Sequence, residues 1–356
     1  MRRLSNIGLA YVADFIISDD KPTLEAINIL DSAPSFAKFV VVVNSRMELI
    51  GTVSDGDIRR GLLNGNDISS PISFFMNTAP KYLHANFSQA EVDDTLRDVK
   101  SAFPFLPVLD KKMKVVDILV QDAHRTQRVA ALIMAGGYGK RLGSRTKSQP
   151  KPLVEVDGKP LLEYVLSQIE ASCVEEIYIS TFYLSEQILK YLEDTGREKT
   201  VHLIEENKPL GTAGAIGLLP KNNFDKFIVT NADVLTELNF DAILNFHWFE
   251  AKSASIAVAE HHVHIPFGVI NHDADGHLLS ISEKPVIKNF VAAGIYCFPN
   301  SVVSIVDIDQ KMDMPELLAR MIADGYKIRT FPIHEYWSDV GTPEDLARAS
   351  REFVRL

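Results

Sequence analysis

A glycine-rich loop near the middle of the chain is the segment best suited to chemistry. Residues 136–142 have the sequence Gly-Gly-Tyr-Gly-Lys-Arg-Leu, and Pro-Lys-Pro follows at 150–152. Glycines let backbone N–H groups approach an anion closely, and oriented amides form a concavity for phosphate oxygens. Arg141 adds a planar fork that suits phosphate oxygens, and Lys151 adds a mobile point charge. The segment therefore predicts a cradle for a triphosphate.

Two other phosphate-binding loops are excluded by single positions. Leu142 stands where the dinucleotide-binding fingerprint requires its third glycine, and the Gly-Lys-Ser/Thr ending of the P-loop is missing. The plain alternative is a flexible turn whose basic residues are solvated. Further matching segments downstream weaken that alternative.

Length and composition describe an ordinary globular protein. The 356 residues suffice for two or three domains, with 46% hydrophobic and 24% charged residues. The net charge of -10 argues against general affinity for nucleic acid. We find no apolar run near the length of a membrane span and expect a soluble, cytoplasmic protein with no membrane partner.

Strands and helices alternate after residue 129, which predicts an α/β domain with a Rossmann-like, mostly parallel sheet covered by helices. Ligands of such sheets bind beyond the carboxyl ends of the strands. The glycine loop, Gly211-Thr212 and the segment 231–233 each follow an expected strand, so they should meet at one edge. The expected strands are 129–134, 176–181, 201–205 and 226–230, and the expected helices are 161–172 and 185–192.

The loop with its downstream Pro-Lys-Pro resembles the sugar-1-phosphate nucleotidyltransferases, and the Leu-Gly-Thr-Ala-Gly segment at 210–214 resembles their guanylyltransferase branch. The resemblance implies that a nucleoside triphosphate and a sugar 1-phosphate give a nucleotide sugar and pyrophosphate, as in surface-glycan assembly. In-line attack on the α-phosphorus needs alignment and charge neutralisation. Arg141 is implied to hold the β- and γ-phosphates and Lys151 to stabilise charge near the α-phosphate. The implied nucleotide-binding residues also include Ala135, Gly136, Gly137 and Asn231.

Two carboxylates are candidate ligands for Mg²⁺, the cofactor that the resemblance implies. Asp233 follows the strand expected over 226–230, and Asp339 lies in the Trp-Ser-Asp-Val-Gly-Thr segment at 337–342. One or two carboxylates plus phosphate oxygens suit this hard cation. Each aspartate alone is also compatible with a turn or capping role.

The acceptor side is carried by the segment Ser-Glu-Lys-Pro at 282–285. The resemblance assigns Glu283 to sugar hydroxyls and Lys284 to the phosphate of the incoming sugar. The alternative is a solvated Glu-Lys pair in a turn before proline. Gly268 and Gly294 would allow close approach of the sugar, although either also fits a bulge, and Tyr296 is the remaining sugar-binding candidate.

Glu206 is the candidate for reading the base. It lies five residues before Gly211, which with Thr212 belongs to a Leu-Gly-Thr-Ala-Gly segment. Uridylyl- and thymidylyltransferases commonly carry glutamine there. A carboxylate only accepts hydrogen bonds, and guanine offers N1–H and N2–H₂ side by side, so we favour GTP. A slip of one residue would instead select Glu205 or Asn207, and a uridylyl- or thymidylyltransferase stays an alternative.

The first part of the chain contains a weak internal repeat. Features of residues 23–57 return about 65 residues later, over 88–122, and each copy is too small to bury its own apolar faces. The repeat resembles a tandem pair of cystathionine-β-synthase (CBS) domains, which commonly bind AMP or ATP. Ser54 and Asp57 match the ligand signature, whereas Leu119 and Asp122 hold the equivalent positions of the second copy. A plain helix cap at Ser54 fits equally well.

We thus expect two parts: an α+β tandem CBS pair over residues 1–125 and the nucleotidyltransferase domain over residues 126–356. A CBS pair offers a surface for a homodimer or a larger homo-oligomer. The alternative is a non-catalytic protein that senses adenylates. The sugar stays open among mannose, glucosamine and heptose phosphates.

Overall fold

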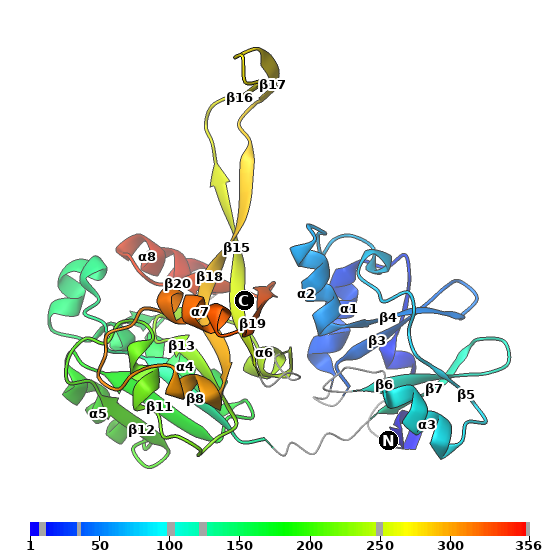
Figure 1. Cartoon of the computed structure of the whole chain (residues 1–356), viewed down its shortest axis with the longest axis horizontal. Coiled ribbons are helices and arrows are strands. Elements are labelled where there is room, and N and C mark those ends of the chain that lie inside the picture. The colour runs from blue at the N-terminus through cyan, green and yellow to red at the C-terminus, as the bar shows by residue number, and fades with distance from the viewer. Residues whose placement is uncertain (7–11, 34–36, 98–103, 121–126, 247–251, 354–356) are drawn as a thin grey trace. The chain divides into compact units, whose positions relative to one another are not determined.

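The computed structural model of the chain is shown in Figure 1. It describes all residues except 7–11, 34–36, 98–103, 121–126, 247–251 and 354–356. The chain forms two compact units, which we describe separately. The amino-terminal unit comprises Met1–Gln127 with Leu244–Ala251, and the carboxyl-terminal unit comprises Arg128–Ile243 with Lys252–Leu356.

The amino-terminal unit contains the same β-α-β-β order twice. In the first copy β2 pairs with β3 in parallel and β3 with β4 antiparallel; in the second copy β5, β6 and β7 repeat these pairings. A helix joins the two parallel strands in each copy. The strands are β1 (Arg2–Arg3), β2 (Ile16–Ser18), β3 (Phe39–Val43), β4 (Leu49–Ser54), β5 (Leu83–His84), β6 (Phe105–Leu109) and β7 (Val115–Val120). The helices are α1 (Thr23–Ser32), α2 (Asp55–Leu63) and α3 (Gln89–Arg97).

The two copies share a core. Every residue of β3 is buried, as its β-branched run predicts. The rings of Phe39 in β3 and Phe105 in β6 stack with their centroids 4.0 Å apart. Val41 and Val43 of β3 pack in one cluster with Ile118 of β7. Neither copy closes its apolar faces alone, which agrees with the repeat found in the sequence.

The carboxyl-terminal unit is built on a seven-stranded sheet in the order β12-β11-β8-β13-β18-β15-β19. The first four strands are parallel, as the alternation of strands and helices predicts. The sheet becomes mixed beyond them, because β18 runs antiparallel to both β13 and β15. The strands are β8 (Val129–Met134), β11 (Glu176–Thr181), β12 (Val201–Glu205), β13 (Lys226–Asn231), β15 (Ser253–His264), β18 (Val286–Pro299) and β19 (Lys327–Ile333).

Helices and short ribbons complete this unit. Leu162, Val165 and Ile169 of α4 are buried, so the apolar stripe found in the sequence faces the core. The helices are α4 (Leu161–Glu170), α5 (Ser185–Asp194), α7 (Met314–Ala323), α8 (Pro343–Glu352) and α6 (Phe240–Phe246), whose residues from Leu244 onward are grouped with the amino-terminal unit. The remaining strands are β9 (Glu155–Val156), β10 (Lys159–Pro160), β14 (Val234–Thr236), β16 (Val269–His272), β17 (Leu278–Ser282) and β20 (Trp337–Asp339). None of the helices in the described residues has the length and apolar character that a membrane span requires.

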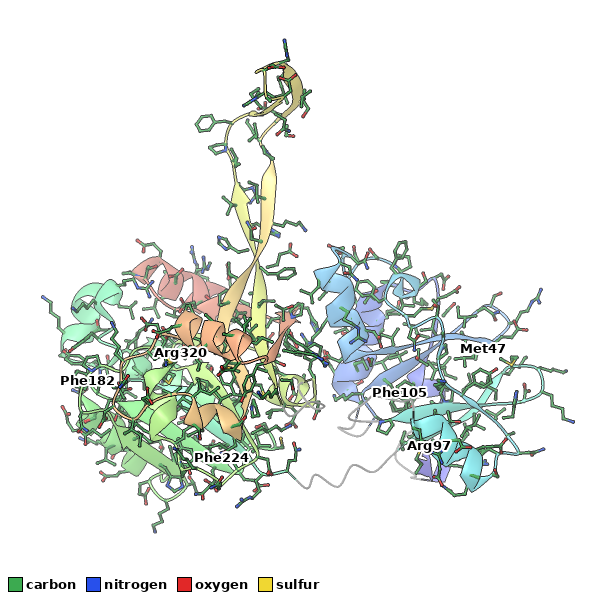
Figure 2. All side chains as sticks on the ribbon, in the orientation of Figure 1. Met47, Arg97, Phe105, Phe182, Phe224 and Arg320 are labelled. Atoms are coloured by element: carbon green, nitrogen blue, oxygen red, sulfur yellow. The ribbon has the colours of Figure 1, made fainter. Side chains whose placement is uncertain are left out.

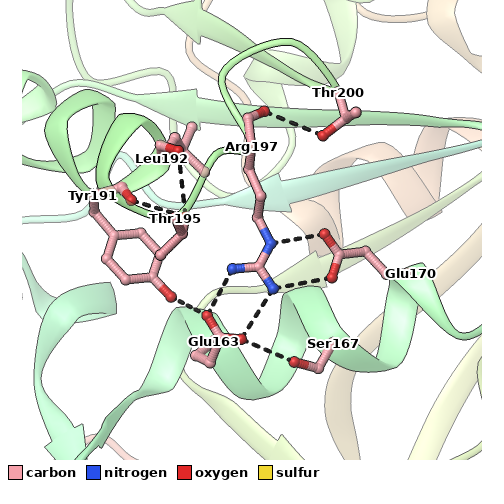
Figure 3. A network of polar contacts seen from close by, with 8 residues as sticks. All are labelled: Glu163, Ser167, Glu170, Tyr191, Leu192, Thr195, Arg197 and Thr200. Carbon is pink, nitrogen blue, oxygen red and sulfur yellow. Dashed lines mark hydrogen bonds and ion pairs between the residues drawn. The ribbon is translucent and has the colours of Figure 1, made fainter.

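A polar network fastens α5 to α4 (Figure 3). Arg197, just after α5, donates from Nε to Glu170 Oε1 at 2.7 Å and from Nη1 to Glu163 Oε2 at 2.9 Å. The Tyr191 hydroxyl also donates to Glu163. The Arg197 side chain is only 17% exposed, so the three polar groups replace much of their hydration with one another. The network fixes the entry to β12, and β12 leads to the predicted base-reading residue.

A two-stranded ribbon, here called the arm, leaves this sheet. It comprises residues 260–290, in which the outer halves of β15 and β18 stay paired from Glu260 opposite Phe290 to His264 opposite Val286. The β16–β17 hairpin forms its tip (Figure 1). Side chains project from both sides of the ribbon (Figure 2).

Candidate active site

A cavity of about 440 Å³ lies at the carboxyl ends of β8, β12 and β13. Parallel strands bring the loops that follow them to one edge of a sheet, so segments far apart in the sequence meet there. Ten of the residues selected from the sequence line this cavity: Ala135, Gly136, Gly137, Arg141, Lys151, Glu206, Gly211, Thr212, Asn231 and Asp233.

The glycine loop after β8 is closed against the Pro-Lys-Pro segment. Gly139 has φ +61°, and a Cβ there would lie 2.9 Å from Lys151 Cβ and 3.0 Å from the methyl group of Thr146. The Thr146 hydroxyl donates to the Gly139 carbonyl at 2.9 Å. A larger residue at Gly139 would therefore displace Lys151, so the glycine positions this cation as well as the loop.

The two predicted cations stand beside the two predicted carboxylates. Lys151, whose side chain is 12% exposed, forms an ion pair with Asp233. Arg141 and Asp339 both lie close to Gly341. A Cβ built on Gly341 would be 3.7 Å from both Arg141 Nη1 and Asp339 Oδ2.

Asp233 and Asp339 are held together by a short ribbon. Val234 of β14 is paired with Asp339 of β20, and the Val340 N–H donates to the Asp233 carbonyl at 3.1 Å. Burial and the neighbouring charge of Asp233 raise the pKa of the Asp339 carboxyl, while Lys151 and Arg141 act in the opposite direction. Two close, partly buried carboxylates beside a phosphate cradle suit a divalent cation such as Mg²⁺, whose charge would relieve their repulsion.

Glu206 faces the cavity from the end of β12. It is 5% exposed, and its Oε2 accepts a hydrogen bond from the Leu210 N–H at 2.9 Å. Burial raises the pKa of the Glu206 carboxyl, against hydrogen bonds from Leu210 and Ser180 that lower it. Oε1 lies on the side of the glycine loop, because a Cβ on Gly136 would be 2.7 Å from it. The neighbouring Glu205 instead accepts from the Ser185 hydroxyl at 3.1 Å.

Gly211 and Thr212 are fixed against the start of α7. Gly211 has φ +78°, and a Cβ there would be 2.6 Å from the Met312 carbonyl oxygen. Thr212 Oγ1 accepts from the Met314 N–H at 2.8 Å, and the Thr212 N–H donates to Asp313 Oδ1 at 3.2 Å. The loop beyond Glu206 is therefore rigidly placed.

The predicted sugar-binding residues are divided between two places. Gly294, with φ +74°, lies against the cavity residue Asn231, since a Cβ on it would be 2.8 Å from Asn231 Nδ2. Tyr296 is 8% exposed and belongs to the apolar core, where its ring stacks on Phe298. The other three, Gly268, Glu283 and Lys284, lie in the arm and are exposed, and the described cavity lining includes none of them.

An acidic cluster at the tip of the arm is explained by the turn that it forms. Asp273, Asp275 and His277 have close potential ligand atoms. The Asp273 carboxylate accepts from the N–H groups of Asp275 at 3.0 Å and His277 at 2.9 Å, as in an Asx turn. The hairpin needs no ion to hold this shape.

The candidate CBS ligand residues start a helix. Ser54 and Asp57 form a capping box at α2: Ser54 Oγ accepts from the Asp57 N–H, and Asp57 Oδ2 accepts from the Ser54 N–H at 2.8 Å. Asp57 also pairs with Arg60 at 2.6 Å. Leu119 of the second copy is buried, and Asp122 lies outside the described residues.

The cavity also contains residues that we did not select from the sequence, including Lys140 and Gly341. Lys140 adds a third cation to the glycine loop, and its Nζ lies 5.1 Å from the centroid of the Tyr138 ring. Both residues lie inside the motifs at 136–142 and 337–342, so position within a motif is the signal that could have found them.

Fold and cavity together define an α/β protein with a charged cavity at the carboxyl edge of its sheet, and comparison with known proteins gives its family. The nucleotidyl transferase family model matches residues 130–355, so the chain belongs to that family.

The chain is similar to the bifunctional protein GlmU of Methanococcus maripaludis, with 33% identity over 235 residues, which is 63% of this chain and 54% of that protein. It is also similar to a putative mannose-1-phosphate guanyltransferase of Sulfolobus acidocaldarius, with 30% identity over 233 residues and 64% of each protein covered. This chain thus spans between half and two thirds of these relatives. A crystal structure of a putative glucose-1-phosphate thymidylyltransferase from Bacillus anthracis in complex with a sucrose shares the fold, with a TM-score of 0.51 and 22% identity over 63% of this chain and 94% of that one.

Proposed function

We propose that this chain transfers a guanylyl group from GTP to a sugar 1-phosphate, giving a GDP-sugar and pyrophosphate. One observation carries the proposal. Arg141, Lys151, Asp233 and the buried Glu206, drawn from separate loops, line one cavity at the carboxyl edge of the sheet, and the Asp339 carboxylate lies beside them, close enough to Asp233, Lys151 and Arg141 to feel their charges. The family membership and the guanyltransferase among the similar proteins support the same activity.

The charged side chains have separate roles in the proposed transfer reaction. Arg141, at the outer end of the glycine loop, binds the β- and γ-phosphates that leave as pyrophosphate. Lys151, fixed by the contact between its own backbone segment and Gly139, stabilises the charge that develops at the α-phosphate. Asp233 and Asp339 would hold Mg²⁺, which neutralises phosphate oxygens when bound.

The base preference rests on Glu206. The carboxylate has acceptor capacity on Oε1, and a guanine edge with two adjacent donors satisfies it. Uracil and thymine present one donor between two acceptors, so an ionised carboxylate would meet at least one acceptor. Of the three neighbouring candidates, Glu206 is the one that lines the cavity.

Lys284 and Glu283 would bind the acceptor, with the Lys284 ammonium neutralising the attacking phosphate and Glu283 accepting from sugar hydroxyls. The family resemblance of the Ser-Glu-Lys-Pro segment supports these roles.

The amino-terminal unit is proposed to be a tandem CBS pair that binds AMP or ATP and contributes to self-association, in a protein of the cytoplasm. The repeated β-α-β-β order supports this assignment. Titration calorimetry with AMP and ATP tests it, and absence of heat with both nucleotides would reject adenylate binding.

A matrix of triphosphates against sugar phosphates tests the activity. GTP, UTP, dTTP and ATP are each combined with mannose, glucosamine and heptose 1-phosphates, and pyrophosphate release is measured. Substitution Lys151→Ala should lower kcat by about 30- to 1,000-fold, the equivalent of roughly 2–4 kcal/mol for a lost preorganised donor. Lys190→Ala, an exposed lysine of α5, is the matched control and should keep wild-type turnover. No release with any pair would favour a non-catalytic, adenylate-sensing protein.

A further inference from the structure

The arm carries a disproportionate share of the exposed apolar surface. Of the twenty large hydrophobic residues that are exposed among the described residues, nine lie between residues 263 and 290. Phe267 is 72% exposed, Leu279 67% and Leu278 59%. A free two-stranded ribbon is at best marginally stable in water, so a surface of this kind indicates a partner.

The area of this surface matches one side of a stable interface. Nine side chains that are about half exposed present roughly 900 Å², if a whole large apolar residue offers about 200 Å². A protein–protein interface of standard size buries about 800 Å² on each partner. The arm alone therefore supplies enough apolar surface for specific association.

The arm also holds the part of the proposed site that the cavity of its own chain lacks. Gly294 touches the cavity residue Asn231, and β18 runs from there back to Val286 as one strand. Those eight residues span about 26 Å at the rise of a β-strand, and Lys284 lies two residues further out. In this conformation Lys284 is well beyond reach of a phosphate bound at Lys151.

We propose that two copies of this chain exchange their arms, so that Lys284 and Glu283 of one copy complete the acceptor site of the other. The inference rests on the proposed function. A second copy is the occupant that the structure favours, because the surface to be covered carries acceptor-binding residues and the matching nucleotide cavity belongs to this same chain. A reciprocal exchange forms a closed, two-fold pair and completes both sites.

Complementation between two inactive variants tests the exchange. One chain carries Asp233→Asn, which disables the cavity, and the other carries Lys284→Ala, which disables the arm. The two full-length chains are co-expressed with different affinity tags, and the mixed dimer is isolated with both tags in succession. Each variant alone should be inactive. In the mixed dimer an intact arm meets an intact cavity at one of its two sites, so about half of wild-type pyrophosphate release per dimer is expected.

Three outcomes would overturn the exchange. A mixed dimer without activity means that each arm serves its own cavity, and failure to isolate any mixed dimer means that the chains do not associate. Activity of Lys284→Ala on its own means that the arm supplies no acceptor contact. An inactive wild-type protein would instead overturn the proposed function. In that case the mass of the particle in solution would still show whether two chains associate.

The apolar contact is tested separately by the mass of the particle in solution. Phe267→Ser with Leu279→Ser should weaken the dimer, so that it dissociates at higher protein concentration than the wild type, and abolish activity, while circular dichroism shows an unchanged fold because both side chains are exposed. The control Ile322→Ser changes a residue of α7 that is 62% exposed and should leave the dimer intact. A double variant that stays dimeric and active would refute the role of the arm.

Discussion

Substitution Glu206→Gln tests the base preference, because it removes one charge and almost no volume. In the structure Oε2 of Glu206 accepts the Leu210 N–H at 2.9 Å, and this donor remains after the substitution. A buried N–H left without an acceptor is costly, so the carbonyl of the glutamine has to take the Oε2 position. Its NH₂ group then takes the Oε1 position, on the side of Gly136.

The size of the expected change in base preference follows from replacing an acceptor with a donor at the Oε1 position. Guanine would meet a donor where N1–H and N2–H₂ need an acceptor, whereas a carbonyl of uracil or thymine would gain a hydrogen bond. A bidentate contact discriminates between bases by about 1–3 kcal/mol, which corresponds to about 5- to 150-fold in kcat/KM. We expect the ratio of kcat/KM for GTP over UTP to fall by a factor in that range.

Pyrophosphate release at low concentrations of each triphosphate measures this ratio directly. Glu205→Gln is the matched control, because Glu205 accepts from Ser185 rather than lining the cavity. An unchanged ratio in Glu206→Gln, or an equal change in Glu205→Gln, would refute the assignment of the base-reading residue.

Three further predictions follow from the same geometry. Because burial raises the pKa of Glu206 above that of a free glutamate and guanine needs its ionised form, KM for GTP should rise as the pH falls towards that raised pKa, and Glu206→Gln should abolish that rise. Arg197→Met should lower the free energy of unfolding in urea by about 1–2 kcal/mol, since Glu163 and Glu170 lose their shared partner, whereas Arg320→Met, which breaks an exposed pair with Glu316, should cost at most about 0.5 kcal/mol. Asp339→Asn should reduce turnover by about 100-fold or more at any Mg²⁺ concentration; full recovery with excess Mg²⁺ would contradict its place at the reacting phosphates.

The central strands could be predicted because their signal is local. The apolar runs that end at Met134 and Asn231 are buried on both faces, as strands inside a parallel sheet must be. The carboxyl ends of such strands share one edge, so the residues that follow them could be grouped from the sequence alone. Glu206, which the family resemblance selected, directly follows β12 and so reaches the same edge.

The acceptor side could not be predicted because it depends on long-range geometry. Gly294 and Tyr296 would share a face in a regular strand. The positive φ at Gly294 breaks this alternation, so Gly294 meets the cavity while Tyr296 enters the core. The arm begins where β15 and β18 extend beyond the neighbouring strands β19 and β13. This difference in strand length is a property of strand pairing and cannot be read from residue types. At Ser54 the sequence supported two roles, and the structure contains the helix cap.

The pairing of Lys151 with Asp233 has a consequence for how the nucleotide arrives. Lys140, Arg141 and Lys151 of the cavity lining are balanced by Glu206 and Asp233 of the same lining and by the adjacent Asp339, so the formal charges of these six groups sum to zero. The whole chain carries -10. An approaching polyanion therefore meets no attractive long-range field, and screening by salt should speed its association rather than slow it. Recognition then depends on short-range contacts that form once the triphosphate is in the cavity. The triphosphate should therefore bind together with its divalent cation, which supplies the positive charge that the cavity lacks.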